Sequence, residues 1–166
     1  MRQALIPSIA VLVIVVFAIV LMPARATTVS GPDLSGSCTN SGTGFNAAFT
    51  ANTLSRVMAW QLNVTFSASA VAPMSYSVSN SFTSNSQIMA KNGTGYYMVG
   101  VAMNGGVTYS SSSTTTFFTL NFKTKVYHAQ TLFDIATGGP FPSELFGSSF
   151  DSLSFNTESG YYGCNV

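Results

Sequence analysis

Apolar and polar side chains alternate with a period of two along much of this chain. In residues 58–67, for example, Trp60 and Leu62 fall on one side, and Gln61 and Asn63 fall on the other. Successive side chains of a β-strand point to opposite faces, so this period is that of a half-buried strand. The pattern predicts a strand with Trp60 in the core and Asn63 on the polar face.

The same reasoning predicts further strands. Residues 74–82 alternate between apolar side chains and serine, and residues 118–126 place Phe118 and Phe122 inward. Residues 96–103 are apolar on both faces, which is typical of a central strand or of one covered by a neighbouring molecule. Asn104-Gly105 follows and predicts a two-residue hairpin turn, with residues 107–109 as the returning strand. One helical turn is expected at residues 143–146.

Short strands separated by turn residues predict an all-β fold. The chain shows no long helical period after residue 26, and no repeat of solenoid length. We therefore expect an Ig-like β-sandwich of roughly seven to nine strands.

A hydrophobic segment precedes the predicted sandwich. A short basic start, Met1 to Gln3, is followed by a nearly continuous apolar run from Ala4 to Met22 and by the small-x-small site 24–26. This layout predicts a secretory signal peptide that is cleaved after Ala26. The run also approaches the length of a membrane-spanning helix, so a retained anchor and a pilin-type leader are the alternatives.

The predicted organisation therefore has three parts. Residues 1–26 form the signal peptide or a retained hydrophobic helix, and residues 27–37 form an N-terminal extension. Residues 38–166 form the β-sandwich domain.

Charge is scarce in this chain. Only 7% of the 166 residues are charged, and the formal net charge is +1, whereas roughly a quarter of an ordinary globular chain is charged. Nucleic-acid binding needs clustered Lys and Arg, so that class is excluded. The polar surface is built from Ser, Thr and Asn, which suits an exported protein at the cell surface or outside the cell.

The two cysteines, Cys38 and Cys164, lie near the two ends of the predicted domain. In an exported protein an even number of cysteines favours a disulfide. On the chain-entropy model a disulfide that closes a loop of this length contributes about 4–5 kcal/mol to stability. Two separate thiols or an intermolecular link are the alternatives. The cysteines and His128 lack the close spacing of metal ligands, so no metal is expected.

Two triplets match the acceptor pattern for N-glycosylation. They are Asn63-Val64-Thr65 and Asn92-Gly93-Thr94. Such triplets arise often by chance in a chain rich in Ser and Thr. We nevertheless predict Asn63 and Asn92 as glycan acceptors.

Catalytic patterns are weak in this sequence. His128 with Asp134 or Asp151 and a serine is a formal triad, but serines are too frequent for such a match to be informative. Glu144 and Glu158 are readily explained as solvated loop acids. We therefore predict no enzyme activity, no catalytic residue and no cofactor.

An exported β-domain with few charges, many hydroxyls and a terminal disulfide resembles the secreted subunits of archaeal surface filaments, of the thread and bundling-pilus type. The resemblance covers the leader, the Thr-rich mature start and the sandwich. It implies that a segment near the mature N-terminus completes the sheet of the next subunit by strand addition. The candidate donor strand is residues 27–37, with Thr27, Val29 and Leu34 as its contact residues, although Gly31-Pro32 interrupts it.

A second resemblance is to the luminal domains of lysosome-associated membrane glycoproteins. It rests on Gln61-Leu62-Asn63-Val64-Thr65 and Tyr162-Gly163-Cys164-Asn165. The second disulfide and the membrane anchor of that family have no counterpart here.

Together these patterns predict an exported, non-enzymatic structural protein. We expect it to be a subunit of an extracellular filament or surface layer that assembles with copies of itself by β-strand addition. A type IV pilin-like subunit and a cell-surface or luminal binding glycoprotein are the alternatives. Nucleic acid is not expected as a partner, and membrane contact is expected only through residues 1–26.

Overall fold

The computed structural model describes residues 26–37 and 40–164. The predicted leader up to Arg25 therefore lies outside the described residues, as do Cys38 and the two C-terminal residues. Within the described ranges, no helix is long and apolar enough to cross a membrane.

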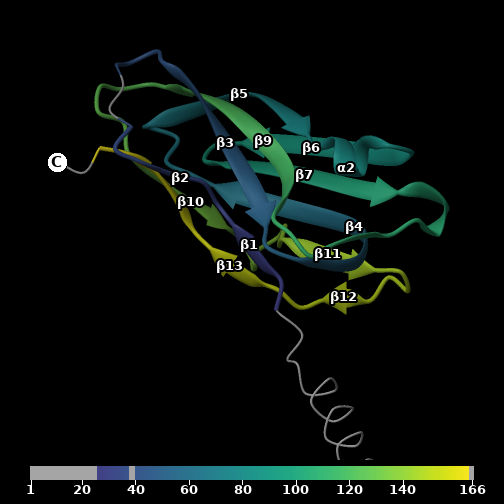
Figure 1. The fold of residues 1–166 in the computed structure, drawn as a ribbon. Helices are drawn as coiled ribbons and strands as arrows, with labels where there is room; N and C mark the ends of the chain where they lie inside the picture. Colours follow the sequence, from purple (N-terminus) through teal and green to yellow (C-terminus); the bar gives the residue numbers. More distant parts are fainter. Residues whose placement is uncertain (1–25, 38–39, 165–166) are drawn as a thin grey trace, which may run out of the picture.

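Two β-sheets pack face to face (Figure 1), which confirms the predicted all-β sandwich. The smaller sheet has five strands, in the order β13 (Asn156–Glu158), β1 (Thr28–Ser30), β3 (Gly44–Ala51), β9 (Thr115–Thr124) and β5 (Val71–Val78).

The larger sheet has nine strands and is centred on β4 (Leu54–Thr65). One edge of β4 pairs with β7 (Tyr96–Met103), which pairs in turn with β6 (Ser86–Gly93). The remaining strands are β2 (Asp33–Ser35), β8 (Tyr109–Ser111), β10 (Thr131–Ile135), β11 (Glu144–Gly147), β12 (Ser152–Leu153) and β14 (Gly160–Gly163). Two short helical turns complete the fold, α2 (Asn80–Thr83) and η1 (Asn104–Gly106).

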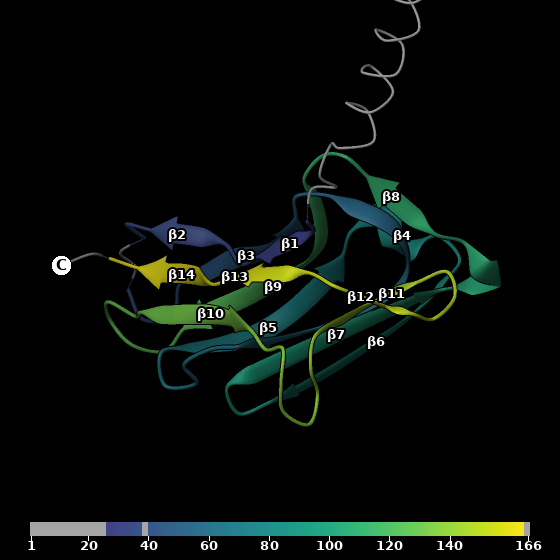
Figure 2. The same ribbon diagram turned by 90° about the horizontal axis from the view of Figure 1, so that it is seen from below.

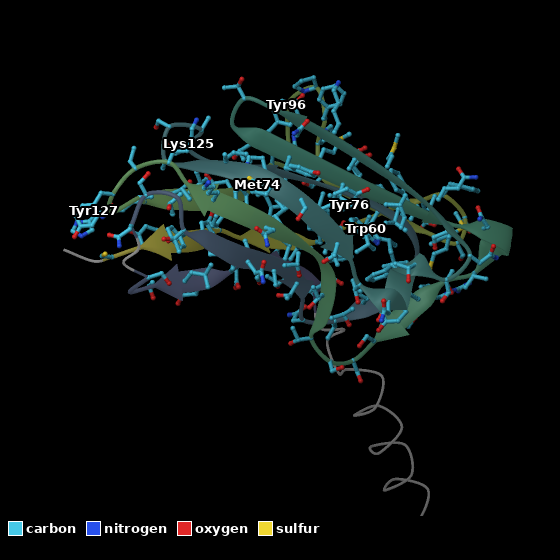
Figure 3. The ribbon with its side chains drawn as sticks, turned by 90° about the horizontal axis from the view of Figure 1, so that it is seen from above. Trp60, Met74, Tyr76, Tyr96, Lys125 and Tyr127 are labelled. Atoms are coloured by element: carbon cyan, nitrogen blue, oxygen red, sulfur yellow. The ribbon has the colours of Figure 1, made fainter. Side chains whose placement is uncertain are left out.

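Aromatic side chains fill the space between the sheets. The Trp60 ring stacks on Phe118 from the opposite sheet, with ring centroids 5.9 Å apart. Phe45 of the smaller sheet stacks on Tyr162 of the larger one at 3.8 Å. Such offset and edge contacts add to the stabilisation from buried area. Trp60 lies in the interior, as its strand pattern predicts, whereas the exposed Tyr127 marks one end of the molecule (Figure 3).

The first strands of the chain pair with its last strands. β1 runs parallel to β13, and β2 runs parallel to β14 (Figure 2). The side chain of Val29 is fully buried in the chain's own core, and Leu34 packs against that core. Residues 27–37, predicted as a donor strand for another subunit, therefore complete the sheets of their own molecule.

The structure differs from the predicted strand pattern at three places. A bulge between Pro73 and Ser75 turns Met74 out to solvent, and α2 brings Phe82 into the core. The predicted hairpin at Asn104 is wrong, since η1 replaces the two-residue turn and β8 pairs with β4. Residues 144–147 form a strand and no helical turn.

Candidate docking face

Four neighbouring strands of the larger sheet present one outward face. They lie in the order β11, β4, β7 and β6. The core side chains Trp60 on β4, Val101 on β7 and Leu145 on β11 point inward. Because side chains alternate along a strand, the residues between them point away from the core.

The register aligns these outward residues in three rows across the strands. The first row runs from β11 to β6 and consists of Phe146, Ala59, Ala102 and Gln87. The second row consists of Glu144, Gln61, Gly100 and Met89, and the third of Asn63, Met98 and Lys91. We call the three rows together the docking face.

The residues of the first two rows, all except Glu144, line a hollow of about 280 Å³. Ala59, Gly100 and Ala102 have little or no side chain, so they form its floor. Phe146 stands on one side and Met89 on the other, where the Met89 side chain is 63% exposed. A shallow apolar hollow with an exposed methionine on its rim is a surface suited to binding another molecule.

The third row is covered by residues 136–143, which we call the strap. The strap leaves the sheet after β10 and returns at β11, and it forms the long loop beside β7 in Figure 2. Asn63 Nδ2 donates to the Phe141 carbonyl at 2.9 Å, and Gln61 Nε2 donates to the Pro142 carbonyl at 2.8 Å. Met98 consequently keeps only 6% of its surface exposed, although it points outward.

A cation–π contact holds the tip of the strap. Lys91 Nζ lies 4.4 Å from the centroid of the Phe141 ring. Within the three rows the charged side chains are Lys91, which this contact occupies, and Glu144 at the opposite end of the second row. The residues that line the hollow are therefore uncharged, whereas Glu144 lines a separate hollow beside the strap.

The two predicted glycan acceptors lie in different surroundings. Asn63 is 8% exposed, and its amide nitrogen is engaged by the strap. Asn92 near the end of β6 and Thr94 in the turn that follows are both exposed. A glycan on Asn63 requires the strap to be displaced, whereas one on Asn92 does not.

The predicted disulfide is only half within the described residues. Cys164 is buried at the end of β14 and is not a free thiol. Cys38 lies outside the described residues. Gly163 pairs with Ser35 of β2, so the described chain ends close to the segment that leads to Cys38. The Cys38–Cys164 bond stays a prediction.

The weak catalytic candidates are dispersed over the surface. His128 lies in an exposed loop and stacks on Tyr127 at 3.8 Å. Asp134 accepts a hydrogen bond from Ser159, and Asp151 caps the turn after β11. Among the described residues, no group of three His, Cys, Asp or Glu side chains is placed to hold a metal ion.

Sequence reasoning did not identify the hollow. Its floor residues Ala59 and Ala102 carry no chemical signature, and Met89 and Phe146 come from distant segments. One signal was present, because residues 96–103 are apolar on both faces and so require a cover on the outward side. The strap covers Met98, but it does not extend over Ala102, which is exposed and lines the hollow.

Comparisons with known proteins give a consistent fold. No protein-family model and no curated protein matches the chain. Among solved structures, a non-cellulosomal cohesin from the archaeon Archaeoglobus fulgidus superposes with a TM-score of 0.66 at 14% identity. The match covers 86% of this chain and 93% of that one.

Two bacterial structures are similar to the same extent. The sixth cohesin of Acetivibrio cellulolyticus scaffoldin B, solved in complex with the Cel5 dockerin, has a TM-score of 0.67 at 17% identity, over 85% of this chain and 100% of that one. A cohesin module from a Clostridium perfringens family 33 glycoside hydrolase has a TM-score of 0.62 at 11% identity, over 86% and 98%.

These similarities correct the expected family and partner. The structures are cohesin modules, not filament subunits, pilins or lysosome-associated glycoproteins, so the predicted self-associating filament protein is wrong. The physical reason is that Val29 and Leu34 are already used within the molecule. The prediction of a non-enzymatic protein agrees with the likeness to cohesins that were solved bound to dockerins. The chain thus has the two-sheet fold of cohesin modules.

Proposed function

We propose that this protein is an extracellular docking module that binds a dockerin-type domain of another protein through its docking face. The observation that carries the proposal is the uncharged hollow on an exposed sheet face of a cohesin fold. The known cohesin complexes supply the class of partner, and the hollow supplies a place where that partner is held.

The residue types around the hollow are those of a protein-binding surface. Interface centres are depleted in charge and enriched in aromatic residues and Met. Around the hollow, Phe146 and Met89 provide those residue types, and the small floor residues let a partner approach the sheet closely. The outer face of the smaller sheet has instead a polar hollow lined by residues such as Asn46, Ser77 and Asn121.

Binding can be tested with a panel of dockerin domains from bacteria and archaea, displayed on yeast and stained with the purified protein. We expect at least one domain to bind with a one-to-one stoichiometry and a Kd of about 1 μM or tighter. Ala102→Arg, which places an unpaired charge in the floor of the hollow, is expected to weaken that binding about tenfold or more.

Ser77→Arg provides the matched control, because Ser77 is exposed on the outward side of β5 in the other sheet. This variant is expected to bind within about twofold of the wild-type protein. A panel without any binder, or an equal loss of affinity in both variants, contradicts the proposal.

Two modifications are expected if the protein is exported. We infer that Asn92 is the better of the two glycan acceptors. We also infer that a Cys38–Cys164 disulfide joins the ends of the domain. Comparing the intact mass of the unreduced protein with that of the reduced and alkylated protein tests the bond. Alkylation of both cysteines in the unreduced protein would exclude the disulfide.

A further inference from the structure

The hollow also indicates what the partner's surface is like, an inference that rests on the proposed docking function. We propose that the partner inserts one large apolar side chain, from an uncharged patch of its surface, between Met89 and Phe146. The site is the open half of the docking face, formed by the first two rows.

The size of the hollow fits a single large side chain. Its volume is about 280 Å³, and an apolar cavity of about 150 Å³ is enough to hold benzene. An aromatic or branched aliphatic side chain fits this space. On the side beyond Gln61 the strap closes the face, which limits the space to the hollow itself.

The floor and wall of the hollow are adapted to each other. A Cβ atom placed on Gly100 would lie 3.3 Å from Met89 Cγ, so glycine is what lets Met89 lie close over β7. Methionine is flexible and polarisable, and it makes favourable contacts with aromatic rings. Met89 is therefore able to adjust around an inserted side chain while Phe146 packs against the opposite side.

The chemistry of the rim defines the rest of the partner's patch. Gln61 is tied to the Pro142 carbonyl, whereas Gln87 is exposed beside Ala102 and carries an amide that can pair with a neutral polar group. Lys91 is engaged with the Phe141 ring. Glu144, at the end of the second row, lines a separate hollow beside the strap. A charged group inserted into the hollow would lose its hydration without an opposite charge among the lining residues, so the part of the partner that enters the hollow is uncharged.

The strap limits the extent of this surface. It covers Asn63 and Met98, leaving the oxygen Oδ1 of Asn63 buried and without a hydrogen-bond partner among the described residues. The partner therefore meets the first two rows and the edge of the strap, and does not reach the third row.

Two variants of the hollow test this inference against a dockerin that binds the wild-type protein. Ala59→Leu fills the floor from β4 and is expected to weaken binding about tenfold or more. Met89→Ala removes an exposed wall without touching the core, and a loss of about threefold or more is expected. Ser77→Leu, on the other sheet, is the matched control and should bind within about twofold of wild type.

Ionic strength provides an independent test. Raising the salt concentration from about 50 mM to about 500 mM should change the Kd by less than about twofold, because no charge pair forms at the hollow. The inference is overturned if Ala59→Leu and Met89→Ala both bind like wild type, or if added salt weakens binding tenfold. If the wild-type protein binds a dockerin while the variants or the salt series give these results, the proposed docking function stands and only the inserted apolar side chain is ruled out.

Discussion

At the scale of single residues, Phe150 has an unusual combination of exposure and backbone conformation. The residue is 78% exposed, and its φ of 60° lies in the left-handed region, which is unfavourable for residues that carry a Cβ. The turn is held by hydrogen bonds from Phe150 N to the Gly147 carbonyl and from Gly147 N to the Asp151 carbonyl. Phe150 therefore contributes little to the core while it occupies a strained position.

Replacing this residue should stabilise the protein. We expect Phe150→Gly to raise the free energy of unfolding by about 0.5–1 kcal/mol, because glycine adopts a positive φ without a steric penalty. Phe150→Ala is the matched control, since it removes the ring but keeps a Cβ. Thermal unfolding of the three proteins gives the comparison, and an equal change in both variants would show that the ring and not the backbone is responsible.

At the scale of elements, the distinctive feature is the crossing of the terminal strands from one sheet to the other. β1 and β13 lie in the smaller sheet, and β2 and β14 continue the same two segments into the larger sheet. The crossing is possible because Gly31 and Gly160 meet there. A Cβ on Gly31 would lie 2.5 Å from Gly160 N, and one on Gly160 would lie 2.6 Å from the Pro32 carbonyl oxygen.

The crossing should tolerate no side chain at either glycine. We expect Gly160→Ala to lower the free energy of unfolding by about 2 kcal/mol or more, because the clash is with backbone atoms that cannot move aside. Gly138→Ala is the control, since a Cβ there meets nothing within 4 Å. Chemical denaturation measures both, and a Gly160→Ala protein as stable as the control would show that the two segments do not cross in this way.

The strand pattern explains which elements were predictable from the sequence. The alternation in β4 and β9 follows from burial on one side, and the structure confirms it with Trp60 and Phe122 in the core. β5 lies at the edge of its sheet, so its side chains are not held to one buried face, and the bulge at Met74 breaks the alternation. The pairing of β8 with β4 is a long-range contact that the Asn104-Gly105 turn alone does not specify.

The docking face was not predictable for a related reason. Its residues come from four strands, and each outward position is ordinary on its own. The face exists only because the register aligns Ala59 with Ala102 and Gln61 with Gly100. The N-terminal segment shows the opposite case, since its short β-strands were predicted to pair between molecules, whereas the fold pairs them internally.

At the scale of the whole molecule, the low charge has a consequence for stability. Hydrogen bonds from Ser35 lower the pKa of the exposed Asp33. Its contribution to the free energy of unfolding is therefore present at neutral pH and is lost as the pH falls through the folded-state pKa. Burial raises the pKa of Tyr97, which destabilises the fold only in strongly alkaline solution. Hydrogen bonds with Ser81 and Thr115 lower the pKa of Tyr109, which stabilises the fold in alkaline solution.

The unfolding temperature should therefore be nearly constant between about pH 5 and about pH 8, because the lowered pKa of Asp33 lies below that interval and the raised pKa of Tyr97 lies above it. Differential scanning calorimetry at several pH values measures this directly. A fall of the unfolding temperature by many degrees near pH 6 would point to a buried titrating group that this account does not contain.

Hydrogen–deuterium exchange of the protein with and without a bound dockerin domain tests the docking account most directly. Protection is expected in β7, β6 and β11, around Met89, Ala102 and Phe146, with β5 and β9 of the smaller sheet unchanged. Protection confined to β5 and β9, or a complex that leaves β6, β7 and β11 exchanging as in the free protein, would contradict the claim that this face is where the partner binds.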